Sequence, residues 1–314
     1  MIRRAWFRWA RREEYRGEKP CGKLPRVADL EIRARRLVEG AFAGRVSSVF
    51  RGRGVEADGV RAYEPGDEIR AVDWNVTARK GSLHVKEFVD DREMEIVLVV
   101  DRSGSLQDLA SPRPAHAVTE VAATLALVAA AGDHPVGLVR IDAATPTRIR
   151  PSRGRNHVRR LLSALMEDAP GGLVDPFPAL RGLNRTLGSR ALVIVLSDFR
   201  WPFQDTGASG TVVSALTALT RSHDVIPIWF REPSPADLPA AGVLEVSDPE
   251  SGDRRLVDLT DPTVRAALAE WENDHRASVE SVFLRLGLLP LDVDPWQDPG
   301  PRLRRYFGTP RRVV

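Results

Sequence analysis

Apolar runs of strand length recur along the chain from residue 94 onward, and they constrain its fold more than any other feature. Most are nearly continuous in Val, Ile and Leu, which is typical of strands buried on both faces. Helical patterns of apolar residues separate these runs. The alternation predicts an α/β fold with a mostly parallel open sheet and helices on both faces. The expected strands are 96–100, 136–141, 191–196, 225–230 and 288–293.

Changes in composition along the chain predict four parts. A turn-rich segment with a helix and short strands precedes the α/β domain, and both ends of the chain are basic. The N-terminal arm places Trp6 and Trp9 on one helical face, so its residues 1–12 suit a membrane surface or a partner. The alternative is an arm that folds back on its own domain. The predicted parts are the basic arm 1–27, the turn-rich segment 28–92, the α/β domain 93–295 and the basic tail 296–314.

Composition excludes several classes of protein. The single Cys21 rules out an internal disulfide and a multi-cysteine metal site. Only four of the 46 basic residues are lysines, and this bias indicates genome composition rather than a nucleic-acid surface. The longest apolar stretch, 118–131, contains Thr119, Glu120 and Thr124, and is shorter than the roughly 18 residues that a membrane span needs. We therefore expect a cytoplasmic protein.

Common enzyme signatures are absent from the sequence. No lysine lies in the Gly-Lys-Ser/Thr context of a phosphate-binding loop, and residues 52–57 lack the third glycine of a dinucleotide-binding loop. There is no G-x-S-x-G motif and no H-E-x-x-H motif. The six histidines are scattered, and none is next to the acidic loops described below. These observations favour a protein that is not an enzyme.

Oxygen-bearing side chains follow two of the predicted strands. Asp101, Ser103 and Ser105 come directly after the first strand, and Asp198 follows the third. Because the carboxyl ends of parallel strands meet at one edge of a sheet, we expect the two acids to lie together. Hydroxyl and carboxylate oxygens are the ligands that Mg²⁺ prefers. The alternative is that Asp101 and Ser105 cap the helix that follows.

This set of residues resembles the metal-ion-dependent adhesion site of the von Willebrand factor A domain. In that family D-x-S-x-S follows the first strand, a later loop supplies a threonine, and an aspartate follows the fourth strand. Asp101, Ser103, Ser105 and Asp198 match the pattern, whereas residues 171–175, where the threonine is expected, contain neither Thr nor Ser. The resemblance implies a von Willebrand A-like fold and a bound Mg²⁺ with one position open to an acidic side chain of a partner.

A long ordered motif precedes the α/β domain. It reads R-G-R-G-V-E at 51–56, R-A-Y-E-P-G-D-E-I-R at 61–70, V-D-W-N at 72–75 and V-K-E-F at 85–88. The motif resembles the signature of a bacterial family called domain of unknown function 58, and the likeness extends from about residue 30 to about residue 310. Ala57 departs from the residue that the family usually has there.

The charged and aromatic members of this motif allow two interpretations. Asp67 and Asp73 can form ion pairs with two arginines of the motif, and Trp74 supplies an apolar body for burial, so the motif can be a structural network. The alternative is a docking surface for a partner. The residues in question are Arg61, Tyr63, Asp67, Arg70, Asp73, Trp74 and Arg79.

The function that we expect is that of a non-enzymatic adaptor. The family resemblance implies work beside a MoxR-type AAA+ ATPase in the assembly of protein complexes, with a protein rather than a nucleic acid as partner. Two alternatives stay open. One is a metal-assisted hydrolase that uses the same carboxylates to activate water. The other is a nucleic-acid binder that uses the Arg-rich segments and loses affinity steeply with salt.

Overall fold

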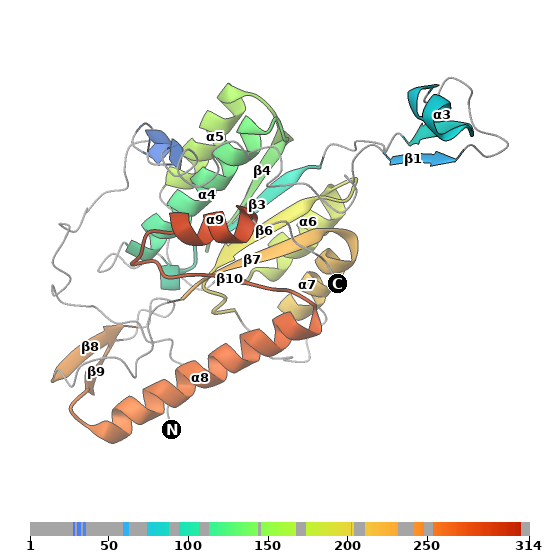
Figure 1. The fold of residues 1–314 in the computed structure, drawn as a ribbon. Coiled ribbons are helices and arrows are strands. Elements are labelled where there is room, and N and C mark those ends of the chain that lie inside the picture. Colours follow the sequence, from blue (N-terminus) through green and yellow to red (C-terminus); the bar gives the residue numbers. More distant parts are fainter. Residues whose placement is uncertain are drawn as a thin grey trace.

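The centre of the molecule is a six-stranded sheet in the strand order β10-β7-β6-β3-β4-β5 (Figure 1). The computed structural model describes residues 28, 30–32, 34–35, 59–62, 74–87, 94–106, 113–143, 146–167, 174–201, 203, 211–231, 242–247 and 254–308. All neighbouring strands are parallel except β5, which runs antiparallel to β4. The strands are β3 (Ile96–Asp101), β4 (Val136–Ile141), β5 (Thr147–Ser152), β6 (Leu192–Ser197), β7 (Asp224–Phe230) and β10 (Leu291–Val293).

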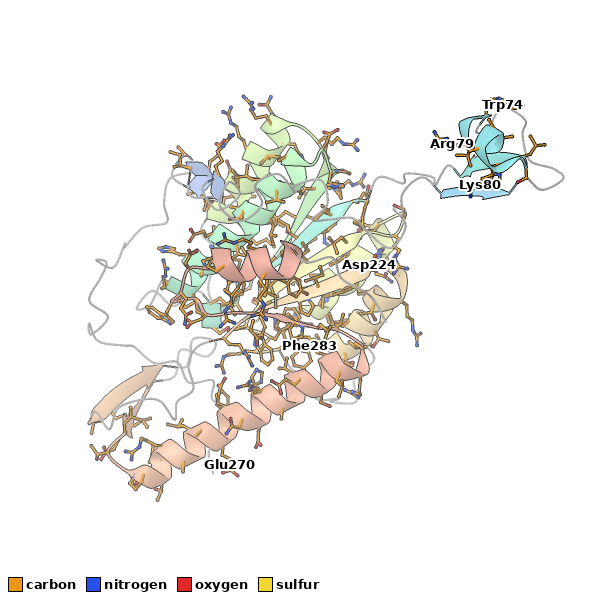
Figure 2. The ribbon with its side chains drawn as sticks, viewed as in Figure 1. Trp74, Arg79, Lys80, Asp224, Glu270 and Phe283 are labelled. Atoms are coloured by element: carbon orange, nitrogen blue, oxygen red, sulfur yellow. The ribbon has the colours of Figure 1, made fainter. Side chains whose placement is uncertain are left out.

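Helices cover both faces of the sheet, as the apolar patterns of these helices predict. Successive residues of a strand point to opposite faces, so Ile96 and Leu98 contact one core while Val97 and Val99 contact the other. Helices α4 (Arg113–Ala131) and α5 (Arg155–Met166) belong to the first core. The second core contains α6 (Phe177–Thr186), α7 (Val212–Ser222) and the C-terminal half of α8 (Pro262–Arg285). Figure 2 labels Phe283 of α8, which belongs to this second core.

The strand order identifies the place where a ligand is expected to bind. Counted along the chain from β3, the six strands lie in the order 3-2-1-4-5-6, read from β5 to β10. In such doubly wound sheets the connections leave in opposite directions from the two middle strands, and ligands bind at the carboxyl ends of the strands there. The two middle strands are β3 and β6, which pair in register from Ile96 opposite Leu192 to Val100 opposite Leu196.

The predicted fold class is confirmed, because the sheet is open, mostly parallel and covered on both faces. All five predicted strands are present within a few residues of their expected bounds. Strand β5 was not predicted, because its sequence T-R-I-R-P-S carries charged residues and a proline rather than an apolar run. Such residues are typical of an edge strand, which pairs on one side only.

Two small units accompany the sheet. Strands β1 (Gly59–Ala62) and β2 (His84–Glu87) form an antiparallel pair next to helix α3 (Trp74–Lys80). In Figure 1 this first unit is drawn apart from the six-stranded sheet. The second unit is the antiparallel pair β8 (Val243–Ser247) and β9 (Arg254–Asp258), which directly precedes α8.

The C-terminal segment adds one more helix, α9 (Gly300–Gly308). Its Leu303 is fully buried in the first core, and Tyr306 and Phe307 pack against the same core. The division of the chain into four parts stays a prediction. The described residues of the basic tail nevertheless belong to the packed structure.

Helix α4 is the one helix of the described residues that is long and apolar enough to cross a membrane. Its mean hydropathy is 1.4, and 72% of the apolar window is buried inside the structure. Residues such as Val121, Leu125 and Val128 contact the first core. Burial against the sheet therefore accounts for its apolar composition.

Candidate functional site

The structure brings Asp101 and Asp198 to the same edge of the sheet. Asp101 is the last residue of β3, and Asp198 directly follows β6, the parallel neighbour of β3. The two carboxylates are close enough for the charge of Asp198 to act on Asp101. This is the edge at which the strand order predicts a ligand.

The carboxylate of Asp101 is enclosed by hydrogen-bond donors. Asp101 is 1% exposed. Its Oδ1 accepts a hydrogen bond of 2.8 Å from the backbone N–H of Ser103. Its Oδ2 accepts bonds from the Ser197 hydroxyl at 2.5 Å and from the Trp201 indole N–H at 2.8 Å. Such donors compensate for part of the cost of burying a charged group.

Burial and a second acid act on the ionisation of Asp101. The pKa of Asp101 is raised from 3.8 to about 6, mainly by burial and next by the neighbouring charge of Asp198. Hydrogen bonds from Ser197 and Ser103 favour the charged form and lower this pKa. Two acids at one edge are therefore held together at an electrostatic cost that a cation would relieve.

The hydroxyl groups of Ser103 and Ser105 lie side by side in the turn that follows β3. Their oxygens are 2.9 Å apart, and both residues are buried. Mg²⁺ binds oxygen at about 2.0–2.1 Å in octahedral geometry, so two adjacent ligands of one ion are about 2.9 Å apart. This separation is also that of a hydrogen bond between the hydroxyls. The donor set of two hydroxyls beside two acids therefore fits Mg²⁺ in its chemistry, while the spacing of the hydroxyls is equally that of a hydrogen bond.

Beyond these two hydroxyls and two acids, the structure offers few further ligands for a metal ion. Among the described residues, no group of three or more His, Cys, Asp or Glu side chains is arranged to hold a metal ion. Residues 171–173, part of the segment where the family pattern places a threonine, lie outside the described residues. From the part of the chain that the structure describes, a cation at this edge would be held by serine hydroxyls rather than by a cage of carboxylates.

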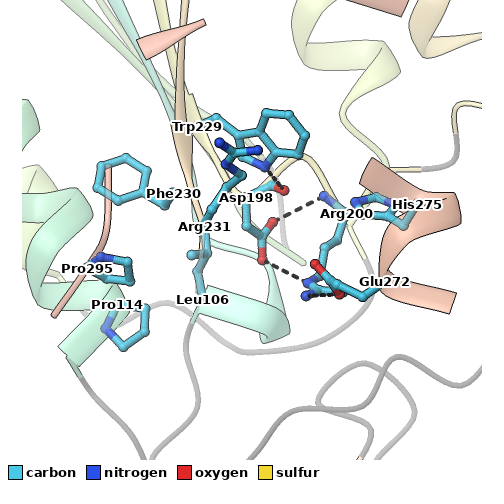
Figure 3. A pocket seen from close by; sticks show the side chains of 10 residues that line it. All are labelled: Leu106, Pro114, Asp198, Arg200, Trp229, Phe230, Arg231, Glu272, His275 and Pro295. Atoms are coloured by element: carbon cyan, nitrogen blue, oxygen red, sulfur yellow. Dashed lines mark hydrogen bonds and ion pairs between the residues drawn. The ribbon is translucent and has the colours of Figure 1, made fainter. Parts of the chain in front are cut away.

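Asp198 lies at the surface end of the site. Its side chain is 11% exposed, and its Oδ1 accepts a bond of 3.2 Å from the backbone N–H of Arg200. The guanidinium of Arg200 is 3.9 Å from Asp198 and 3.0 Å from Glu272 of α8 (Figure 3). The ring N–H of Trp229 donates to the backbone carbonyl of Asp198 at 2.9 Å. These contacts fix the loop after β6 against α8 and β7.

A small pocket adjoins Asp198. Its cavity volume is about 20 Å³, which is room for one water molecule or ion rather than for a large ligand. One wall is apolar and the other carries charged groups (Figure 3). The apolar wall consists of Leu106, Pro114, Phe230 and Pro295, and the polar wall includes Asp198, Arg200, Arg231, Glu272 and His275.

Aromatic side chains pack behind this edge. Phe199 has a positive φ of 52°, which is uncommon for a residue with a side chain, and its ring is fully buried. The ring contacts Trp201 and Phe283 edge-on, each with centroids 5.0 Å apart, and Trp229 lies at 6.3 Å. The packing holds Trp201 where its N–H reaches Asp101.

The place of His275 at this edge was not predicted from the sequence. Although no histidine is next to the acidic loops in sequence, His275 of α8 lines the same pocket as Asp198. Burial, and to a smaller extent the charge of Arg200, lowers the pKa of His275 to about 3. Its ring stacks on Trp271 at 6.4 Å. The imidazole is therefore neutral at physiological pH.

The structure changes the interpretation of the turn-rich motif. Trp74, whose burial only the structural interpretation of the motif predicts, is 64% exposed in α3. Arg79 is exposed, and its predicted pairing with an acid of the motif stays a prediction, because Asp67 and Asp73 lie outside the described residues. Arg61 lies in β1, but its side chain is not among those that the structure describes. The other motif residues outside the described part are Tyr63, Asp67, Arg70 and Asp73.

The fold and the site together define an α/β protein with a mostly parallel sheet, whose carboxyl edge at β3 and β6 carries two acids and a pair of hydroxyls. A family model described as "Protein of unknown function DUF58" matches residues 59–278. The chain belongs to this family.

Relatives of the chain are uncharacterized proteins. Proteins of Mycobacterium tuberculosis and Mycobacterium bovis are 31% identical over 287 residues, which cover 90% of this chain and 88% of each relative. A Paracoccus denitrificans protein, described as an uncharacterized protein in the moxR 3' region, is 33% identical over 105 residues, or 33% of this chain and 92% of that protein.

Solved structures with some likeness include the pilus adhesin SpaC of Lactobacillus rhamnosus GG. It has a TM-score of 0.43 and 14% identity, over 70% of this chain and 29% of the adhesin. An aerotolerance-related membrane protein of Bacteroides fragilis has a TM-score of 0.39 and 12% identity, over 68% of this chain and 96% of that protein.

Proposed function

We propose that this protein is a non-enzymatic adaptor that binds a partner protein at the carboxyl edge of β3 and β6. The observation that carries the proposal is the arrangement at this edge. The hydroxyl pair of Ser103 and Ser105 lies in the same short loop as the buried Asp101, and Asp198 lines a pocket with one apolar wall. Because the pocket has room for only a water molecule or an ion, the proposal places one side chain of the partner at its opening, beside Asp198.

The partner in this proposal is a MoxR-type AAA+ ATPase, with which the adaptor assembles protein complexes in the cytoplasm. Support comes from the Paracoccus denitrificans relative, whose description refers to a moxR 3' region. In this scheme the ATPase supplies force, and the edge of the sheet holds a protein partner in place.

We further propose that Mg²⁺ completes the edge site. Ser103 and Ser105 would hold the ion, and Asp101 and Asp198 would supply negative charge. When bound, Mg²⁺ would offer a coordination position to an acidic side chain of the partner. Asp101 would act mainly as a buried counter-charge, since its oxygens already accept three hydrogen bonds.

The hydrolase alternative has less support from this edge. A general base works best when its pKa is near the working pH. The pKa of His275, about 3, is far below neutrality, so this imidazole is a weak proton acceptor. Asp101 has a pKa of about 6, but it is 1% exposed and its oxygens already accept three hydrogen bonds. We therefore propose an adaptor rather than a hydrolase.

The proposal is tested by binding to a purified MoxR-type ATPase of the same organism, measured by biolayer interferometry. Replacing Asp198 by Asn removes one charge at the pocket and should weaken binding about tenfold, a change of about 1.4 kcal/mol. The matched control is Glu270→Gln, which removes one exposed carboxylate from α8. Equal affinities of the wild type and the Asp198 variant would contradict the proposal.

The metal is tested on the adaptor alone by thermal unfolding in Mg²⁺ and in EDTA. We expect Mg²⁺ to raise the melting temperature of the wild type, because a ligand that binds only the folded state stabilises it. Ser105→Ala should lose this increase, whereas Ser163→Ala, at an exposed position on α5, should keep it. An unchanged melting temperature of the wild type would contradict the role of Mg²⁺. The partner site would still be tested by the measurement of binding to the ATPase.

A further inference from the structure

Arg102 anchors the loop that carries the hydroxyl pair, although its own side chain is not part of the edge site. It lies between Asp101 and Ser103 in the turn after β3, and it is 1% exposed. Among the described residues it is the largest side chain that is fully buried. A buried cationic group is costly unless its N–H groups find acceptors, so its contacts show what holds it in place.

Both the backbone and the side chain of Arg102 bond to neighbouring elements. Its backbone N–H donates to the Ile141 carbonyl at 2.7 Å and so continues the pairing of β3 with β4. Its guanidinium reaches the C-terminal end of α5, where Nη1 donates to the Leu165 carbonyl at 2.7 Å and Nη2 donates to the Glu167 carbonyl at 3.4 Å. The start of the loop is therefore fixed both to β4 and to α5.

The end of α5 is a favourable place for a guanidinium. The last carbonyl groups of a helix receive no N–H from the helix itself, and they carry a partial negative charge. A planar guanidinium has several N–H groups and can serve two such carbonyls, which a single ammonium does less well. The end of α5 therefore determines where Arg102 lies, and this in turn fixes the backbone at the start of the loop.

The other end of the loop is fixed by Leu106, which is buried in the first core. Between these two anchors the Ser103 N–H donates to Asp101 Oδ1 at 2.8 Å, and the Leu106 N–H donates to the Ser103 carbonyl at 3.0 Å. The hydroxyls of Ser103 and Ser105 belong to this short turn and lie 2.9 Å apart. Their separation therefore depends on a backbone that is held at both ends.

We propose that Arg102 is a positioning residue, which holds the hydroxyls of Ser103 and Ser105 at the spacing that the edge site uses. The inference rests on the proposed function of this edge. Arg102 acts only through the loop, because its fully buried guanidinium contacts α5 rather than a partner. Binding groups must be held within about 0.5 Å of their productive positions, and supporting residues of this kind provide that precision.

Arg140 provides a matched comparison. This arginine of β4 is also buried, and its Nη1 donates to the Ala164 carbonyl of α5 at 2.6 Å. It forms an ion pair with the buried Asp142 at 3.0 Å, so its loss should destabilise the fold at least as much as the loss of Arg102. Arg140 is not part of the loop. A role that consisted only in closing the end of α5 would make the two arginines equivalent.

The test measures hydrogen exchange of the full chain in EDTA by mass spectrometry, so it requires neither Mg²⁺ nor a partner. The exchange rate of amides 103–106 is divided by that of the β3 amides 97–100, which removes the effect of global unfolding. Arg102→Met should raise this ratio at least about tenfold, because the loop loses its anchor on α5. Arg140→Met should leave the ratio unchanged.

A lysine at the same position gives a graded comparison. Arg102→Lys keeps the charge and can serve one carbonyl, so the exchange ratio should rise only about threefold. Thermal unfolding shows whether each variant folds. Should a methionine variant fail to fold, Arg102→Lys and Arg140→Lys make the same comparison with a smaller loss of stability.

Binding measurements show whether the edge site uses the spacing that Arg102 maintains. In the interferometry measurement with the MoxR-type ATPase, Arg102→Met should weaken binding about tenfold, whereas Arg140→Met should change it by less than about twofold. The increase of the melting temperature in Mg²⁺ should be lost in Arg102→Met and kept in Arg140→Met.

Two results would overturn the inference. One is the same exchange ratio for the wild type and for Arg102→Met. The other is ATPase binding that Arg102→Met leaves unchanged while Asp198→Asn weakens it. If neither variant weakens binding, the proposed function of the edge fails instead, and the exchange ratio alone decides whether Arg102 positions the loop.

Discussion

Trp201 shows how one distant side chain completes the environment of Asp101. The indole N–H reaches Asp101 across 100 positions of the sequence, and Ser197 reaches it across 96. The sequence indicates that Asp101 follows a buried strand, but nothing in the letters S-D-F-R-W identifies Trp201 as its donor. The contact depends on the positive φ of Phe199 and on the packing of its ring, which only the folded chain defines.

At the scale of the residue, His275 predicts a pH dependence of stability. Its folded pKa is about 3, below the ordinary value of 6.5, so the unfolded chain binds a proton first as the pH falls. Its contribution to stability is therefore present above pH 6.5 and is lost progressively toward pH 3. Between pH 7.5 and 5.5 the loss should be roughly 1 kcal/mol.

His275→Gln isolates this contribution, because glutamine does not titrate. Urea unfolding at several pH values should show the free energy of unfolding of the wild type falling relative to the variant as the pH decreases. The comparison with the variant is needed because the raised pKa of Asp101 acts in the opposite sense over part of this range. Parallel pH profiles for the two proteins would contradict the assignment.

At the scale of the element, β5 depends on a glycine in its neighbour β4. A Cβ on Gly137 would lie 2.9 Å from the Ile149 carbonyl and 2.9 Å from the Pro151 nitrogen, closer than real Cβ contacts. The pairing of β4 and β5 is irregular between Val136 and Leu138. Glycine therefore allows a strand of unfavourable composition to pair with the sheet.

Gly137→Ala should destabilise the protein by about 1–3 kcal/mol, because β5 must shift away from β4. Gly188→Ala is the matched control, since a Cβ there meets nothing within 4 Å. Chemical denaturation of both variants measures the difference. A Gly137 variant as stable as the Gly188 variant would show that β5 adjusts without cost.

At the scale of the whole molecule, the C-terminal segment closes one core. The chain returns from β10 through α9 to the core that α4 and α5 share with the sheet, and it places Leu303 there. Arg113 of α4 donates to the Pro295 carbonyl at 3.0 Å, across 182 positions of the sequence. The packing of the tail in the core was not predicted, because the tail is basic and its few apolar residues are spaced among arginines.

Leu303→Ala should lower the free energy of unfolding by about 2–4 kcal/mol, as for other fully buried leucines. Leu284→Ala is the matched control, because Leu284 is 83% exposed and should change stability by less than about 0.5 kcal/mol. Equal stability of the two variants would mean that α9 does not belong to the cooperative core.

The fold class and the meeting of Asp101 and Asp198 were predictable from the sequence alone. Parallel strands that are buried on both faces need continuous apolar residues, so the fold class follows from a local pattern. Polar residues at the carboxyl ends of neighbouring parallel strands lie at the same edge of the sheet, so the meeting of the two acids follows as well. The donors around Asp101, the exposure of Trp74 and the place of His275 were decided by the tertiary structure. Each of them depends on contacts between segments far apart in the sequence, and packing rather than periodicity determines which side chains meet.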